Sequence, residues 1–282
     1  MRSSRVQRKQ NKVLYWIIAS VLCIVGILGI YALSQSEPSK QGENKSSTQL
    51  LSKQKVTQQQ TYQVSADEKK YLSERFKSLS QINSEAVGYV YAPNTLLDEP
   101  IVQTHDNETY LDKTFEGEHK PLLGSVYMDM DNNKQFSDKL TWLFGHARGS
   151  HVPDHRMFKT VNYYDNQTYF DEHRYVVIET PERKYYYEAM FLIIVPENTA
   201  FYKTHFNSDD EFVNQLSEVQ KQATSKAKQV NIQSSDNYLV LSTCREDDDT
   251  IRSNLYLRQI TDAELPEFLA QHGEKLAYKP TR

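Results

Sequence analysis

Glycine and proline are scarce in this chain, with nine of each among 282 residues. Neither G-x-G-x-x-G nor G-x-x-x-x-G-K-[ST] occurs, so the loops that cradle the phosphates of dinucleotides and nucleoside triphosphates are not predicted. Aromatic residues are plentiful instead, and 19 Tyr with 11 Phe favour half-buried β structure. The content of 38% hydrophobic and 25% charged residues suits a folded core and excludes collagen-like, disordered and multi-span membrane proteins.

Cysteine is rarer still. Of the two cysteines, Cys23 lies inside a long apolar run and Cys244 lies near the end of the chain, so we do not expect them to pair. A lone cysteine of this kind is a buried hydrophobe, half of an intermolecular bridge, or a nucleophile. Its surroundings must decide between the three.

Acidic residues are missing from positions 1–12, which hold five basic side chains. The formal net charge of the whole chain is −4, so the remaining 270 residues carry −9. Binding to nucleic acid needs a positive face. The acidic body of the chain therefore argues against a nucleic-acid partner.

An uncharged apolar run of 21 residues, 13–33, follows the basic stretch. As a helix it would be about 30 Å long, which is the thickness of a bilayer core. The positive-inside rule then predicts a single-pass protein of the cell membrane, with residues 1–12 as a cytoplasmic tail and the main domain extracellular. The alternative is a cleaved signal peptide, whose apolar region is usually shorter.

The rest of the chain predicts a stalk followed by one folded domain. Residues 34–65 are rich in Ser, Gln, Lys and Thr, as flexible linkers are, and the folded domain is expected over 66–282. It should open with an amphipathic helix at 66–82. A second, longer helix is predicted at 208–226, with Ser208 as its N-cap.

Short apolar or alternating runs between polar turns predict eight strands. They are residues 86–92, 100–104, 124–130, 140–146, 174–180, 184–196, 237–244 and 253–260. Eight strands between residues 86 and 260 indicate a closed or nearly closed barrel. The predicted fold class is therefore mainly β, an eight-stranded barrel with an N-terminal helix and one long helix inserted before the seventh strand.

Three side chains at strand ends have the chemistry of a thiol enzyme. Cys244 ends the run YLVLSTC, where a side chain is held firmly and yet accessible. His146 ends the run LTWLFGH and could act as general acid or base. Arg252 begins the next strand after Cys244, and a hairpin would bring its guanidinium near the sulfur, where it could hold a carbonyl or an oxyanion.

Together these residues resemble the sortases, the membrane-anchored cysteine transpeptidases of Gram-positive bacteria. LSTC at 241–244 is similar to the strand end of that family, FGH at 144–146 is similar to its Gly-His turn, and Arg252 lies in the following strand. The segment 99–129 resembles class B members, which have a Pro-Val-Val-Gln strand, an Asn-x-x-Tyr-Leu segment and a Gly-Ser strand ending in Asp. The short acidic loop between Cys244 and Arg252 departs from the family pattern.

The resemblance implies a mechanism and partners. Cys244 would attack the carbonyl of a Thr in a C-terminal LPXTG-like sorting signal to form a thioester, Arg252 would hold the substrate, and His146 would transfer protons. Ser242 and Thr243 would line the substrate groove. The substrates would be surface proteins or pilins, and the acceptor amine would be a pilin Lys or a peptidoglycan precursor, with pilus assembly favoured over wall anchoring. No cofactor and no metal are implied.

Two other functions stay open at this stage. His146, His151 and His155 lie within ten residues and could bind Zn²⁺ in a metal-dependent hydrolase, although their spacing matches no common zinc motif. The chain could also be a non-catalytic anchored barrel that binds pilin or wall components, with Cys244 simply buried. Sensitivity to EDTA would indicate the first, and slow alkylation of Cys244 would indicate the second.

Overall fold

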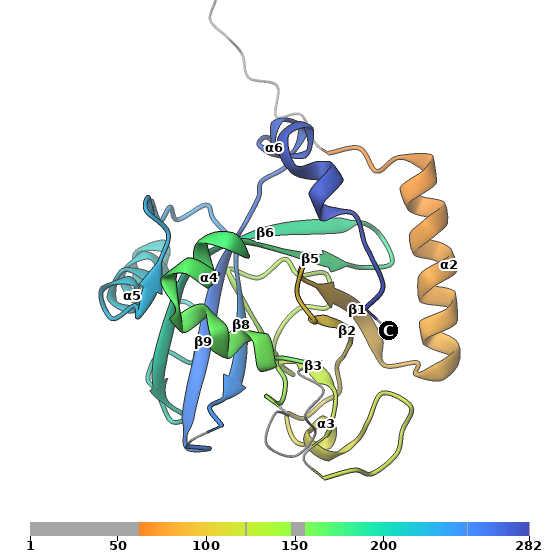
Figure 1. Cartoon of the computed structure of the whole chain (residues 1–282), viewed down its shortest axis with the longest axis horizontal. Helices are drawn as coiled ribbons and strands as arrows, with labels where there is room; N and C mark the ends of the chain where they lie inside the picture. Colours follow the sequence, from red (N-terminus) through yellow and green to blue (C-terminus); the bar gives the residue numbers. More distant parts are fainter. Residues whose placement is uncertain (1–61, 122, 148–155, 247, 282) are drawn as a thin grey trace, which may run out of the picture. The chain divides into compact units, whose positions relative to one another are not determined.

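The computed structural model describes residues 62–121, 123–147, 156–246 and 248–281 (Figure 1). All of them belong to one compact unit, Thr57–Arg282. The predicted tail and apolar run, and all but the last four residues of the predicted stalk, lie outside the described residues. Those predicted boundaries therefore stay predictions.

Eight strands close into a barrel, as predicted. Around the barrel their order is β5-β1-β2-β3-β4-β8-β9-β6, and pairing of β5 with β6 completes the circle. Their bounds are β1 (Ala86–Tyr91), β2 (Asp98–Val102), β3 (Val126–Met128), β4 (Leu140–Phe144), β5 (Tyr175–Glu179), β6 (Lys184–Pro196), β8 (Tyr238–Cys244) and β9 (Ile251–Gln259). The pairs β2–β3 and β4–β8 are parallel and the others are antiparallel. The fold is a closed, mixed, mainly β barrel.

Successive side chains of β8 point alternately to the inside and the outside of the barrel, and they contribute to two separate hydrophobic cores. Leu239 and Leu241 point into the barrel, where they join apolar side chains from most of the other strands. Tyr238 and Val240 point outward and pack under a helix. Cys244 continues the outward set. The thiol therefore lies on the outer face of the sheet, beyond the end of the second core.

The helix over that outer face is α5 (Asp209–Lys221), which buries Phe212, Leu216 and Val219 against β4, β6, β8 and β9. The side chain of Ser208 accepts a hydrogen bond from the backbone N–H of Glu211, as expected of an N-cap. The prediction of helix over 208–226 was too long. Ser225–Lys226 forms a short strand, β7, that pairs with β6, because sheet pairing there competes with continuation of the helix.

The N-terminal helix α2 (Ala66–Ile82) has the predicted bounds. Leu72 and Phe76 form its buried stripe, which packs against Tyr89 and Tyr91 of β1. In Figure 1, α2 and α5 lie on opposite sides of the barrel. The other helical segments are short and were not predicted: α3 (Thr109–Asp112), η1 (Lys159–Asp165), α4 (Gln167–Glu172), α6 (Leu265–His272) and η2 (Gly273–Leu276).

The predicted single-pass localisation in the cell membrane needs correction. Among the helices of the described residues, none combines the length and the apolar character that crossing a bilayer requires. The longest of them, α2, has 17 residues, and charged side chains cover much of its surface outside the apolar stripe. The run predicted as the anchor, 13–33, lies outside the described residues.

Candidate active site

A pocket of about 560 Å³ opens on the outer face of the sheet, where β4 and β8 end and β9 begins. Its floor and walls come from these strands, from Ser125 and Tyr127 at β3, and from two chain segments, 107–111 and 197–202. The lining residues are Asn107, Leu111, Ser125, Tyr127, Trp142, Phe144, Gly145, His146, Glu197, Asn198, Thr199, Tyr202, Ser242, Thr243, Cys244, Arg252 and Asn254. All five of the predicted site residues are among them.

Cys244 and Arg252 lie opposite each other on the neighbouring antiparallel strands β8 and β9. Cys244 is the last residue of β8 and is a half-buried free thiol. The side chain of Asn162 donates a hydrogen bond of 3.1 Å to its backbone carbonyl. The pairing of two rigid strands therefore fixes where the thiol and the guanidinium stand relative to each other.

Burial and charge act on the thiol in opposite directions. Burial raises the pKa of Cys244, because desolvation disfavours the thiolate, and the nearby carboxylates of Asp249 and Glu197 raise it further. The guanidinium of Arg252 pulls the pKa of Cys244 down but does not cancel these effects. At neutral pH the thiol form of Cys244 therefore predominates.

Arg252 has partners on two sides. Its Nη2 is 2.7 Å from Oε2 of Glu197, which lies just past the end of β6. Its Nη1 donates to the backbone carbonyls of Asp249 and Ile251. A guanidinium has five N–H donors, so donors remain for a ligand in the pocket. Glu197 is a site residue that the sequence analysis missed, because only the tertiary pairing of β6 with β9 brings it to Arg252.

His146 follows β4 and borders the same pocket from the other side. Its Nε2 is 2.8 Å from the backbone carbonyl oxygen of Leu111 in α3. The structure therefore brings the predicted cysteine, histidine and arginine around one cavity, each at or near the end of a strand. Their catalytic roles stay a prediction.

Ser242 and Thr243 both border the pocket, but from different faces of β8. Ser242 is on the same face as Cys244, two residues along the strand, and its side chain is buried at the pocket floor. Thr243 alternates to the other face and is 2% exposed. A ligand in the pocket would therefore meet Ser242 more directly than Thr243.

Aromatic rings form one wall of the pocket. Phe144 packs against Tyr127, Trp142 and Tyr202, with ring centroids 5.3 to 6.1 Å apart. The hydroxyl of Tyr202 donates to the buried carboxylate of Asp129, to which Asn107 also donates at 2.9 Å. Such a wall can receive the apolar side chains of an extended peptide.

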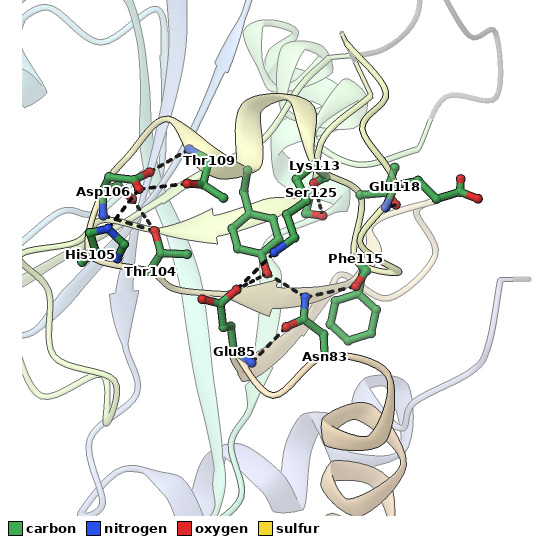
Figure 2. A network of polar contacts seen from close by, with 12 residues as sticks. Asn83, Glu85, Thr104, His105, Asp106, Thr109, Lys113, Phe115, Glu118 and Ser125 are labelled. Atoms are coloured by element: carbon green, nitrogen blue, oxygen red, sulfur yellow. Dashed lines mark hydrogen bonds and ion pairs between the residues drawn. The ribbon is translucent and has the colours of Figure 1, made fainter.

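The segment between β2 and β3 carries Asn107 and Leu111 and is held by the polar network in Figure 2. Asp106 accepts hydrogen bonds from the backbone N–H groups of Glu108 and Thr109 at the start of α3. These hydrogen bonds lower the pKa of Asp106 to about 2. These hydrogen bonds therefore tie the start of α3 to the loop that precedes it.

The described part of the chain contains no cluster of metal-ligating side chains that would support the zinc hypothesis. There, no group of three or more His, Cys, Asp or Glu side chains is arranged to hold a metal ion. His151 and His155 lie outside the described residues. The hydrolase alternative therefore stays an untested prediction.

Comparison with known proteins points to one family. No family model matches the chain. The chain is 27% identical over 189 residues to Sortase B of Staphylococcus aureus, which covers 67% of this chain and 75% of the relative. Its structure resembles the S. aureus sortase B–substrate complex, with a TM-score of 0.61, 27% identity and coverage of 67% of this chain and 86% of the other. A sortase B complexed with triglycine gives a TM-score of 0.60, 27% identity and coverage of 67% and 87%.

Proposed function

The chain belongs to the sortase family, and from that premise we propose that it is a cysteine transpeptidase whose nucleophile is Cys244. The observation that carries the proposal is the pocket bordered jointly by Cys244, Arg252 and His146. A thiol, a permanent cation and an imidazole are the three groups that acyl transfer through a thioester needs.

In the first half-reaction, the minor thiolate form of Cys244, in equilibrium with the predominant thiol, attacks the backbone carbonyl carbon of a Thr in the sorting signal. A carbon–sulfur bond forms, and the tetrahedral oxyanion is stabilised by donors of Arg252 that remain free of Glu197. When the carbon–nitrogen bond breaks, the His146 imidazolium gives its proton to the leaving amine. The product is a thioester between the substrate and Cys244.

In the second half-reaction, an amine attacks the thioester carbon and His146, now neutral, accepts the proton that the amine loses. The carbon–sulfur bond breaks and Cys244 leaves as the thiolate, so no other reactant is required. The acceptor is the side chain of a pilin Lys or the amine of a cell-wall cross-bridge. Both are ammonium ions in solution, and the carboxylates of Glu197 and Asp249 near the thiol favour their approach. Each ammonium ion must release one proton to water before the neutral amine can attack.

Substrate recognition follows from the shape of the pocket. The aromatic wall around Phe144 receives apolar side chains of the signal, and Ser242 lies beside the thiol on the pocket floor. A relative of similar fold has been solved with its substrate and another with triglycine, which supports a peptide donor and an amine acceptor for this chain.

A transfer assay tests the proposed function. The full chain is incubated with a panel of sorting-signal peptides and with either a Lys-containing peptide or oligoglycine, and products are identified by mass spectrometry. We expect a peptide cut after Thr and joined to one acceptor by wild type and not by Cys244→Ala. Cleavage that persists in Cys244→Ala, or that EDTA abolishes, would instead support a metal-dependent hydrolase.

A further inference from the structure

The Asn-x-x-Tyr-Leu segment has no part in the steps above, although it forms one side of the pocket. Its last residue, Leu111, contacts His146 through its backbone: the carbonyl oxygen is 2.8 Å from Nε2 of the ring. A carbonyl oxygen can only accept a hydrogen bond, so Nε2 must carry a proton. In the neutral ring the lone pair then lies on Nδ1, and Nδ1 is the atom left to exchange a proton with an amine.

The neighbouring Tyr110 fixes the backbone that presents this carbonyl. Tyr110 is 2% exposed, and its hydroxyl donates to Oε2 of Glu85 at 2.6 Å and accepts from Nδ2 of Asn83 at 2.7 Å. Figure 2 labels these two partners. Asn83 also donates to the carbonyl of Phe115 at 3.0 Å and caps the end of α2. Burial, with the hydrogen bond to Glu85, raises the pKa of Tyr110 to about 12, so the phenol stays a neutral donor at working pH.

Gly124 packs closely against the backbone of Tyr110 and Leu111. Its φ is +49°, and a Cβ there would lie 2.4 Å from the carbonyl oxygen of Leu111 and 2.5 Å from that of Tyr110. The next residue, Ser125, donates its N–H to the Tyr110 carbonyl at 3.0 Å. The Leu111 carbonyl is thus held between a buried tyrosine and a close backbone contact.

We propose that Tyr110 is a positioning residue for His146: it fixes the Leu111 carbonyl, which selects the Nε2–H tautomer and directs Nδ1 toward the reacting amine. Tyr110 itself does not border the pocket and touches no substrate. The catalytic consequence rests on the proposed function, whereas the effect on the imidazole does not.

The experiment compares Tyr110→Phe with Tyr91→Phe in the full chain. Tyr91 is a matched control, because it is 4% exposed and its hydroxyl donates a single bond of 2.9 Å to the Leu276 carbonyl, away from the pocket. Two quantities are measured: the tautomer of His146 from its imidazole ¹⁵N NMR shifts, assigned with His146→Gln, and kcat and KM for peptide transfer.

We expect wild type and Tyr91→Phe to show one Nε2–H tautomer, and Tyr110→Phe to show a mixture of both. We also expect Tyr110→Phe to lower kcat at least tenfold relative to Tyr91→Phe, with KM changed less than threefold. An unchanged tautomer in Tyr110→Phe, or equal losses of kcat in the two variants, would overturn the proposal. If wild type transfers no peptide, the proposed function fails, but the NMR comparison still decides whether Tyr110 positions the ring.

Discussion

Cys244 stands between one cation and two anions, and this balance sets how much of it is thiolate. Burial is the largest influence and raises the pKa of Cys244, Arg252 lowers it, and Asp249 and Glu197 raise it. Glu197 is also the ion-pair partner of Arg252 at 2.7 Å. Only the thiolate is nucleophilic. Substitution of Arg252 and substitution of Glu197 should therefore change the reactivity of Cys244 in opposite directions.

The first prediction concerns alkylation of Cys244 by a small methanethiosulfonate between pH 6 and 10. Arg252→Gln removes the group that lowers the pKa of Cys244, so the rate at pH 7 should fall by about threefold. Glu197→Gln removes a group that raises the pKa of Cys244, so the rate should rise by about as much. In every variant the rate should climb with pH until the pKa is reached.

The control for this series is Glu182→Gln, which removes a carboxylate in the exposed turn between β5 and β6. Its profile should match that of wild type. Superimposable profiles for Arg252→Gln and Glu197→Gln would show that neither side chain influences the thiol, and the electrostatic account of the site would fail.

At the residue scale, the sequence could propose Cys244, His146 and Arg252 as candidates at strand ends because each terminates or begins an apolar run. A strand end next to polar residues is a local signal. Glu197 and the Leu111 carbonyl carry no such signal, since their contacts depend on β6 lying beside β9 and on α3 lying beside the end of β4. Only the closed fold reveals them.

At the scale of elements, the connection from β2 to β3 depends on one glycine. Gly124 has a positive φ and lies against the carbonyls of Tyr110 and Leu111. Gly117, in the same connection, also has a positive φ of +90°, but a Cβ there would have nothing within 4 Å. A substitution at Gly117 therefore tests backbone strain alone, and one at Gly124 tests backbone strain together with steric contact.

The second prediction compares Gly124→Ala with Gly117→Ala by denaturant unfolding. Gly117→Ala incurs only the strain of a positive φ and should cost about 1–2 kcal/mol. Gly124→Ala adds the collision with two carbonyls and should cost about 2–4 kcal/mol. Equal costs for the two variants would contradict the close packing inferred at Gly124.

Elements whose apolar residues recur with a clear helical or strand period could be predicted from the sequence. Elements that form only through strand pairing in the folded protein could not. The bounds of α2 match the prediction because Leu72 and Phe76 recur at helical spacing and Ser65 caps the helix. The strand β7 was missed because its two residues extend an amphipathic pattern and form a strand only through pairing with β6. The four-residue α3 is too short to leave a periodic signal.

At the scale of the whole molecule, the C-terminal segment is fastened to the barrel through Asp98 of β2. Its carboxylate accepts hydrogen bonds from the N–H and hydroxyl of Thr281, both at 2.9 Å, and from the hydroxyl of Tyr89 at 2.8 Å. Burial alone would raise the pKa of Asp98, but these hydrogen bonds outweigh it and the pKa is lowered. Asp98 therefore joins residues nearly two hundred positions apart.

The third prediction concerns how the stability contributed by the Asp98 hydrogen bonds depends on pH. A lowered folded-state pKa contributes stability above the unfolded value, about 3.9, and the contribution is lost as pH falls through the folded-state pKa. Asp98→Asn should cost about 1–3 kcal/mol at pH 7, and the difference from wild type should narrow below about pH 4. Thermal unfolding of both proteins from pH 7 to pH 2.5 measures it, and a difference that stays constant over this range would contradict the assignment.

The closed architecture was predictable from the number and spacing of the strands, whereas their order was not. Eight short runs in one domain indicate a barrel. The parallel pairs β2–β3 and β4–β8 depend on long crossovers whose path has no signature in a single sequence. The pairing of β4 with β8 is nevertheless what brings His146 to the side of Cys244.

The most direct test of the account is the intact mass of the full chain after incubation with a sorting-signal peptide and no acceptor. The account predicts a mass increase equal to the peptide minus its leaving fragment, located on Cys244, reversed by hydroxylamine and absent from Cys244→Ala. No adduct with any peptide of the panel, although Cys244 is alkylated freely, would contradict a thioester intermediate and with it the proposed function.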